Sequence, residues 1–178
     1  MRIIVTVSGA VLLAACQQPG QTGAEASNVA VTNADIAKTA TVAPPLTREA
    51  ALKLMHDRHE NYEKIGKAFK TAGRALKSDT PDPAVLRTSA ATIAGLAPQV
   101  SGWFPTGTGP DVGKTMARPE IWQKPEDFAA KTKNLLDAAS AFDAAAKAGD
   151  MTAIQASFGA LGKTCKVCHD SYRNEHEK

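Results

Sequence analysis

The sequence predicts an all-α protein, an antiparallel up-down four-helix bundle with a long loop between the second and third helices. Alanine is abundant and aromatic residues make up 5% of the chain, a composition that favours helices. In four segments apolar residues recur three and four positions apart, as on one face of a helix. Short turns join the first pair and the last pair of segments, and helices joined in this way pack antiparallel.

The first two helices are delimited by capping and breaking residues. Thr47 is a good N-cap, and the first helix is expected to run to about Lys77. Residues 78–81 (Ser-Asp-Thr-Pro) break it and cap the second helix, which we expect from Pro83 to about Gln99. The apolar stripe of the first helix comprises Leu52, Met55, His59, Tyr62, Ile65, Phe69, Ala72 and Leu76.

Residues 101–124 are too rich in glycine and proline for a helix and are predicted to form a loop over one edge of the core. The third helix should begin near Pro125 and stop at Gly149, and Asp150 should cap the fourth. Apolar loop residues that can pack on the core are Trp103, Phe104, Ile121 and Trp122. The inner face of the fourth helix comprises Ile154, Phe158, Leu161, Cys165, Cys168 and Tyr172.

The N-terminal quarter of the chain is expected to carry export signals rather than a fold. Residues 1–15 combine a basic start with a short apolar run, which is typical of a signal peptide. Leu-Ala-Ala-Cys at its end resembles the bacterial lipobox, so Cys16 is expected to be lipidated; ordinary cleavage nearby is the alternative. Residues 16–45 lack amphipathic period and are interpreted as a flexible tether. The bundle is then formed by residues 46–178.

Near the C-terminus Cys165, Cys168 and His169 form a C-x-x-C-H motif, the attachment signature of c-type haem. Positions i and i+3 of a helix share one face, so both thiols can reach the two vinyl groups on one porphyrin edge. The histidine that follows can bind the iron.

Two other interpretations of the motif have less support. A structural zinc site needs four ligands, and the remaining candidates, Cys16, His56, His59 and His176, include no second paired cluster. A redox C-x-x-C normally accompanies a βαβ pattern, and none is visible. Haem attachment is therefore the prediction.

With these elements in place, the chain from residue 47 onward resembles the class II c-type cytochromes, the cytochrome c′ family. Residues 165–173 are similar to the family's C-K-x-C-H-x-x-Y/F-R/K ending, and residues 118–122 (Arg-Pro-Glu-Ile-Trp) match a segment seen in members. Arg58 and Tyr62 fit the spacing of the family's first-helix arginine and distal haem residue. The resemblance implies one covalent haem c in a four-helix bundle.

The same resemblance implies roles for individual residues. Arg58 would pair with a haem propionate, Arg173 would lie beside the proximal histidine, and Tyr62 would cover the open sixth position of the iron. The alternative readings are a solvated Arg58 and a core Tyr62 with its hydroxyl at the surface. Low-spin members use a first-helix methionine as sixth ligand; here Met55 lies seven residues before Tyr62 and could bind iron only in a shifted register. His59 is a second possible ligand.

The expected function is that of an exported haem protein, not an enzyme. A five-coordinate iron would bind small gases, nitric oxide or carbon monoxide, or exchange electrons with an unidentified redox partner; a low-spin electron carrier with Met55 as sixth ligand is the alternative. Peroxidase chemistry would need a distal base, and only His59 is near. The formal net charge is +3 without a Lys/Arg-dense run, which does not suggest nucleic acid. We expect a periplasmic protein anchored to the outer membrane through Cys16, and members of the family also form homodimers.

Overall fold

The computed structural model describes residues 46–175, and this part of the chain is helical. The elements are α1 (Arg48–Ala75), α2 (Pro83–Leu96), the 3₁₀ helix η2 (Ala97–Trp103), α3 (Glu120–Gln123), α4 (Pro125–Ala148) and α5 (Met151–Tyr172). The described residues contain no β-strand, only an isolated antiparallel bridge between Ala117 and Arg173. The predicted all-α class is confirmed.

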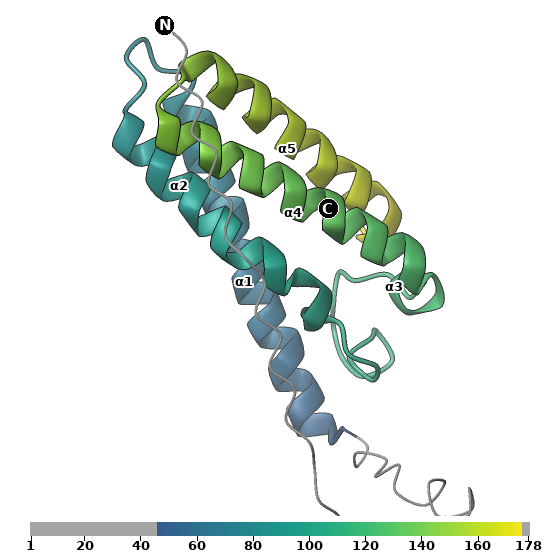
Figure 1. The fold of residues 1–178 in the computed structure, drawn as a ribbon. Helices are drawn as coiled ribbons and strands as arrows, with labels where there is room; N and C mark the ends of the chain where they lie inside the picture. Colours follow the sequence, from purple (N-terminus) through teal and green to yellow (C-terminus); the bar gives the residue numbers. More distant parts are fainter. Residues whose placement is uncertain (1–45, 176–178) are drawn as a thin grey trace, which may run out of the picture. The chain divides into compact units, whose positions relative to one another are not determined.

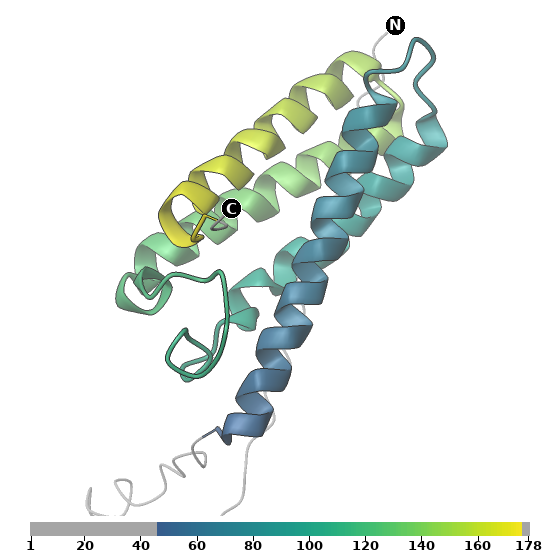
Figure 2. The same cartoon turned by 180° about the vertical axis from the view of Figure 1, so that it is seen from behind.

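The four long helices form an up-down bundle, with α2 packed between α1 and α4 and α5 packed on α4 (Figures 1 and 2). Where α1 meets α5, the rings of Phe69 and Phe158 stack with centroids 4.3 Å apart. Each ring lies on a glycine of the opposite helix: a Cβ at Gly73 would come within 3.2 Å of Phe158, and one at Gly162 within 3.2 Å of Phe69. This pair therefore holds α1 and α5 together where the two helices meet.

The hydrophobic core combines large side chains with alanines that let the helices approach closely. Burying the large side chains supplies most of the driving force for packing. The largest fully buried apolar side chains are Phe142, Leu86, Ile93, Ile154, Leu161 and Val100. The alanines fully buried among them are Ala72, Ala90, Ala139 and Ala146.

Most helix boundaries agree with the sequence. Thr47 caps α1 by accepting from the Ala50 amide at 3.3 Å, and Asp150 caps α5 by accepting from the Thr152 amide at 2.9 Å. The cap of α2 is Asp82, whose carboxylate accepts from Ala84 at 2.8 Å, rather than a residue of the 78–81 turn.

The prediction that no helix survives in residues 101–124 was wrong at both ends. After α2 ends at Leu96 the chain continues as η2 to Trp103, and Glu120–Gln123 form a helical turn. Pro98 gives the physical reason at the first boundary: it has no amide proton for an α-helical hydrogen bond, so the backbone tightens into 3₁₀ geometry instead of unwinding.

The buried face of α1 also differs from the predicted stripe. Leu52 and His59 are exposed, and His59 pairs with Glu63 at 3.2 Å. Arg58, an expected polar position, is instead buried between Met55 and Tyr62. Hydrophobic periodicity misplaces this face because a buried guanidinium is counted as polar although its hydrogen bonds are satisfied inside the protein.

Candidate functional site

The last two turns of α5 carry Cys165 and Cys168 on the face directed into the protein. Both thiols are free and half-buried; Cys165 packs on the main core and Cys168 on a second cluster with Phe128 and Tyr172. Burial raises the pKa of both, to about 11 for Cys168, where a neighbouring Cys165 thiolate adds to the effect. Val167, between them, is 53% exposed. The helix therefore presents two neutral thiols on one face, as the spacing predicts.

His169 follows the second cysteine and its side chain is exposed. Desolvation lowers its pKa, and so does the charge of Arg173, while Asp170 acts in the opposite direction. Among the described residues no hydrogen bond engages its ring nitrogens. A neutral imidazole with an uncommitted nitrogen is the form that binds a metal.

Opposite the cysteines, α1 contributes Tyr62. Burial is the main reason why the pKa of its phenol is raised. The negative charges that ionised Cys168 and, to a smaller extent, ionised Cys165 would carry raise this pKa further. Tyr62 thus lies within electrostatic reach of both thiols although it comes from another helix. The structure brings together these three residues of the predicted site.

A chain of aromatic rings connects the two sides. The Tyr62 ring packs against Trp103 and, at 6.2 Å between centroids, against Phe104. Phe104 meets Phe128 of α4 at 5.0 Å, and Phe128 meets Tyr172 of α5 at 5.2 Å. The region between α1 and the end of α5 is therefore lined with aromatic surface, which suits a flat apolar group.

Arg58 is not the solvated side chain of the alternative interpretation. Its side chain is buried, and its two terminal nitrogens donate to oxygens of Trp103, Thr108 and Thr115. Sequence reasoning missed the two threonines. The Gly-Thr-Gly context of Thr108 signals a tight loop, but nothing in it identifies the partner 50 residues away.

Arg173 ends α5, where its amide donates to the His169 carbonyl at 3.0 Å. The backbone around it pairs with the long loop: Arg118 donates to the Tyr172 carbonyl at 3.0 Å, and Asn174 to the Met116 carbonyl at 2.8 Å. The loop after η2 is thus fixed beside the histidine. Arg173 does lie close enough to His169 to lower its pKa.

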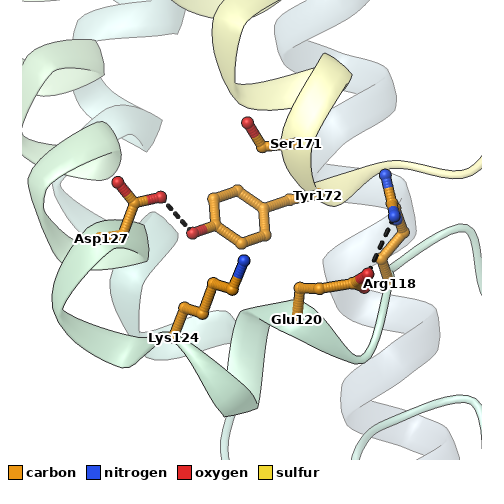
Figure 3. Close-up of a pocket in the computed structure, with 6 residues that line it drawn as sticks. All are labelled: Arg118, Glu120, Lys124, Asp127, Ser171 and Tyr172. Carbon is orange, nitrogen blue, oxygen red and sulfur yellow. Dashed lines mark hydrogen bonds and ion pairs between the residues drawn. The ribbon is translucent and has the colours of Figure 1, made fainter.

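A small polar pocket of about 260 Å³ lies beside this end of α5 (Figure 3). In it the hydroxyl of Tyr172 donates to Asp127, and Arg118 pairs with Glu120 at 2.8 Å. The hydrogen bond lowers the pKa of Asp127, while burial raises that of Tyr172 to about 12. The hydrogen bond from Tyr172 to Asp127 therefore ties the last turn of α5 to α4 at this pocket.

Met55, the alternative iron ligand, is buried elsewhere. A Cβ at Gly113 would come within 3.5 Å of its methyl group, so the long loop covers it. Seven helical residues separate it from Tyr62, about 10 Å along the axis. Its side chain therefore packs under the loop rather than beside the cysteines.

The residues present fit a haem. Two unpaired thiols lie on one helix face, an uncommitted imidazole follows them, and aromatic side chains border the same region. No group of three or more metal-ligating side chains exists among the described residues, which gives no support to a zinc site. None of the described helices is both long and apolar enough to cross a membrane. Cys16 and His176 lie outside the described residues.

Comparisons with known proteins agree with this arrangement. The family model described as Cytochrome C′ matches residues 53–173. Cytochrome c′ of Rhodospirillum rubrum is 38% identical over 105 residues, 59% of this chain and 71% of the relative. A solved cytochrome c′ "with an unusual ligand-controlled dimer dissociation" is 27% identical, with a TM-score of 0.65 over 73% of this chain and 98% of that one. The nitric oxide complex of a mutant cytochrome c prime from Alcaligenes xylosoxidans is 30% identical, with a TM-score of 0.63 and the same coverage.

Proposed function

Because this chain belongs to the cytochrome c′ family, haem-binding and electron-transfer proteins with a covalent haem c, we propose that Cys165 and Cys168 hold that haem through two thioether bonds. His169 is its axial iron ligand, and its lowered pKa keeps the imidazole neutral for this role. Arg173 stays beside the histidine. The bound iron supplies reversible one-electron chemistry and an affinity for small gases.

The open coordination position faces Tyr62, and the protein is a five-coordinate, high-spin cytochrome. The observation that carries this proposal is the contrast within α1. Tyr62 lies within electrostatic reach of both cysteines, whereas Met55 is covered by the loop at Gly113 and His59 is exposed and paired with Glu63. A protonated phenol is a poor ligand for ferrous iron, so Tyr62 covers the position without occupying it.

With that position open, the protein binds nitric oxide or carbon monoxide and exchanges electrons with a redox partner. A relative of similar fold forms a nitric oxide complex, which supports the gas-binding role. The optical spectrum of the reduced protein tests the proposal. A broad, unresolved α band that changes on addition of carbon monoxide is expected; a sharp, split band indifferent to carbon monoxide indicates six-coordinate iron and contradicts it.

The proposed location is the periplasm, with the bundle held at the outer membrane by a lipid on Cys16 and the tether of residues 16–45 after cleavage of residues 1–15. The sequence of the N-terminal segment alone supports this part. A homodimer is proposed as well, because a relative of similar fold shows ligand-controlled dimer dissociation, and Leu52 and Leu54, on different sides of α1, are each exposed, at 40% and 38%. Sedimentation of the wild type and of a Leu52→Gln, Leu54→Gln double variant tests it: loss of a dimer is expected, and a wild-type monomer contradicts it.

A further inference from the structure

The guanidinium of Arg58 is the centre of a buried hydrogen-bond network that joins α1 to the long loop. Its side chain is 4% exposed. One terminal nitrogen donates to the Trp103 carbonyl at 3.3 Å and the Thr108 hydroxyl at 3.2 Å; the other donates to the Thr108 carbonyl and the Thr115 hydroxyl, both at 3.1 Å. The first acceptor lies on Trp103, the last residue of η2, and the others lie in the twelve residues that follow, 104–115, which contain no helix or strand.

The network also fixes aromatic side chains. The guanidinium carbon lies 4.6 Å from the centre of the Phe104 ring, in cation–π geometry. Thr108, itself fully buried, donates its hydroxyl to the Pro105 carbonyl at 2.8 Å. The Trp122 indole donates to the Phe104 carbonyl at 3.0 Å from the other side. Trp103 and Phe104 are consequently held against the ring of Tyr62.

Further along, the loop lies against the first turns of α1 with weaker restraints. Arg48 donates to the Val112 carbonyl at 3.3 Å, an exposed contact. At Gly113 a Cβ would come within 2.6 Å of Leu52, so the backbone approaches the helix more closely than another residue would allow without movement. Arg58 is therefore the buried anchor, and these contacts only set the course of the outer part of the loop.

The acceptors of Arg58 are all uncharged oxygens, and none of the ion pairs among the described residues includes it. Burial lowers its pKa, yet an arginine stays charged in proteins. The free-energy cost of burying this charge is offset by several directed hydrogen bonds, which the planar guanidinium can donate at the same time. Lysine could keep the charge but not these contacts.

We propose that Arg58 is a positioning residue: through Thr108 and Thr115 it clamps the loop of residues 103–115, holds Trp103 and Phe104 beside Tyr62, and so sets which ligands reach the haem face that Tyr62 covers. The part that concerns ligands rests on the proposed function; the clamp itself does not. Ion pairing of Arg58 with a haem propionate is the competing role.

The test uses the haem-loaded protein and the variants Thr108→Val, Arg58→Lys and Arg58→Met. Thr108→Val removes one acceptor of Arg58, together with the donor to the Pro105 carbonyl, without changing charge, so it loosens the clamp and leaves any propionate pairing intact. Arg74→Met is the matched control, because Arg74 lies on the same helix, is exposed, and its side chain bonds only Thr71 among the described residues. Hydrogen exchange of residues 103–115 and the association rate of carbon monoxide are measured for each.

A charge-assisted hydrogen bond is worth about one to two powers of ten in an equilibrium constant. Hydrogen exchange in residues 103–115 should accelerate roughly tenfold or more in Thr108→Val and further in Arg58→Met. The exchange rate of Arg58→Lys should be closer to that of Arg58→Met than to that of wild type. Carbon monoxide association should quicken in the same order, and Arg74→Met should match wild type in both measurements.

Two results would overturn the inference. Unchanged exchange in Thr108→Val, with Arg58→Met altering only the pH dependence of the reduction potential, assigns Arg58 to a propionate instead. Faster exchange with an unchanged carbon monoxide rate shows a clamp that does not control access. A six-coordinate spectrum that excludes carbon monoxide refutes the proposed function, and the exchange data still decide the clamp.

Discussion

The ring of Tyr62 packs edge-on against Trp103, with centroids 5.2 Å apart and planes 81° from parallel. Tyr62 comes from the middle of α1, whereas Trp103 ends η2, in a part of the chain that the sequence predicts as loop. The orientation of the first-helix tyrosine is therefore set by a residue 41 positions later in the chain. This contact restrains the ring of Tyr62 in one orientation.

Tyr62→Ala should accelerate carbon monoxide binding by about tenfold, equivalent to a barrier lower by about 1.4 kcal/mol, because the variant removes this ring. It should also admit bulkier ligands, while the resting spectrum stays high-spin. Flash photolysis and stopped-flow mixing measure the rates. Tyr62→Phe is the control and should resemble wild type; an equal effect of both variants would implicate the hydroxyl rather than the ring.

Met55→Leu should leave the optical spectrum unchanged, since Met55 packs under Gly113 rather than at the iron. The exchange nearly conserves volume, so the free energy of unfolding should fall by less than about 1.5 kcal/mol. Conversion of a low-spin to a high-spin spectrum in this variant would identify Met55 as the sixth ligand and refute the position given to Tyr62.

Replacing Cys165 and Cys168 together by serine should abolish covalent haem attachment. It should also destabilise the bundle, because the region bordered by the aromatic side chains loses the haem that is proposed to occupy it. Haem staining after denaturing electrophoresis is the measurement. Cys16→Ser serves as the control and should keep the stain, since that cysteine is not part of the motif. Stain retained in the double variant contradicts the assignment.

Cys16→Ser should shift the protein from the membrane fraction to the soluble periplasmic fraction, because lipid on this cysteine is the proposed anchor. Fractionation followed by haem staining measures the shift. Thr22→Ala, a change within the tether, should leave the distribution as in wild type. Wild-type protein that is already soluble would show that the lipobox interpretation is wrong.

Tyr172→Phe should make stability less dependent on pH. The hydrogen bond from Tyr172 lowers the pKa of Asp127, so its contribution is present above the unfolded value, about 3.9, and is lost as pH falls through the folded value. Because the pKa of Tyr172 is raised from about 10 to about 12, the contribution is also lost as pH rises between these values.

The denaturation midpoint, measured against pH, should therefore differ most between wild type and Tyr172→Phe from about pH 5 to about pH 10. Ser171→Ala is the control: its hydroxyl donates only to the Val167 carbonyl and does not titrate in this range. A difference that stays constant into acid and alkali would show that the hydroxyl matters only through packing.

The sequence by itself determined the all-α class, the two helix pairs and the C-x-x-C-H face of α5. These are local properties: a cap such as Asp150, a stop such as Gly149 and the spacing of Cys165 and Cys168 act within one or two turns of backbone. Periodicity identified them without knowledge of any partner segment.

Only the tertiary structure decided what surrounds that face. Arg58 is buried because oxygens of Trp103, Thr108 and Thr115 satisfy it, and His59, one residue later, is exposed because no segment within residues 46–175 covers it. Such positions depend on contacts between residues about 50 apart, made by a loop with no periodic signal. Periodicity ranks residues by polarity, whereas burial depends on whether a distant partner supplies the missing hydrogen bonds.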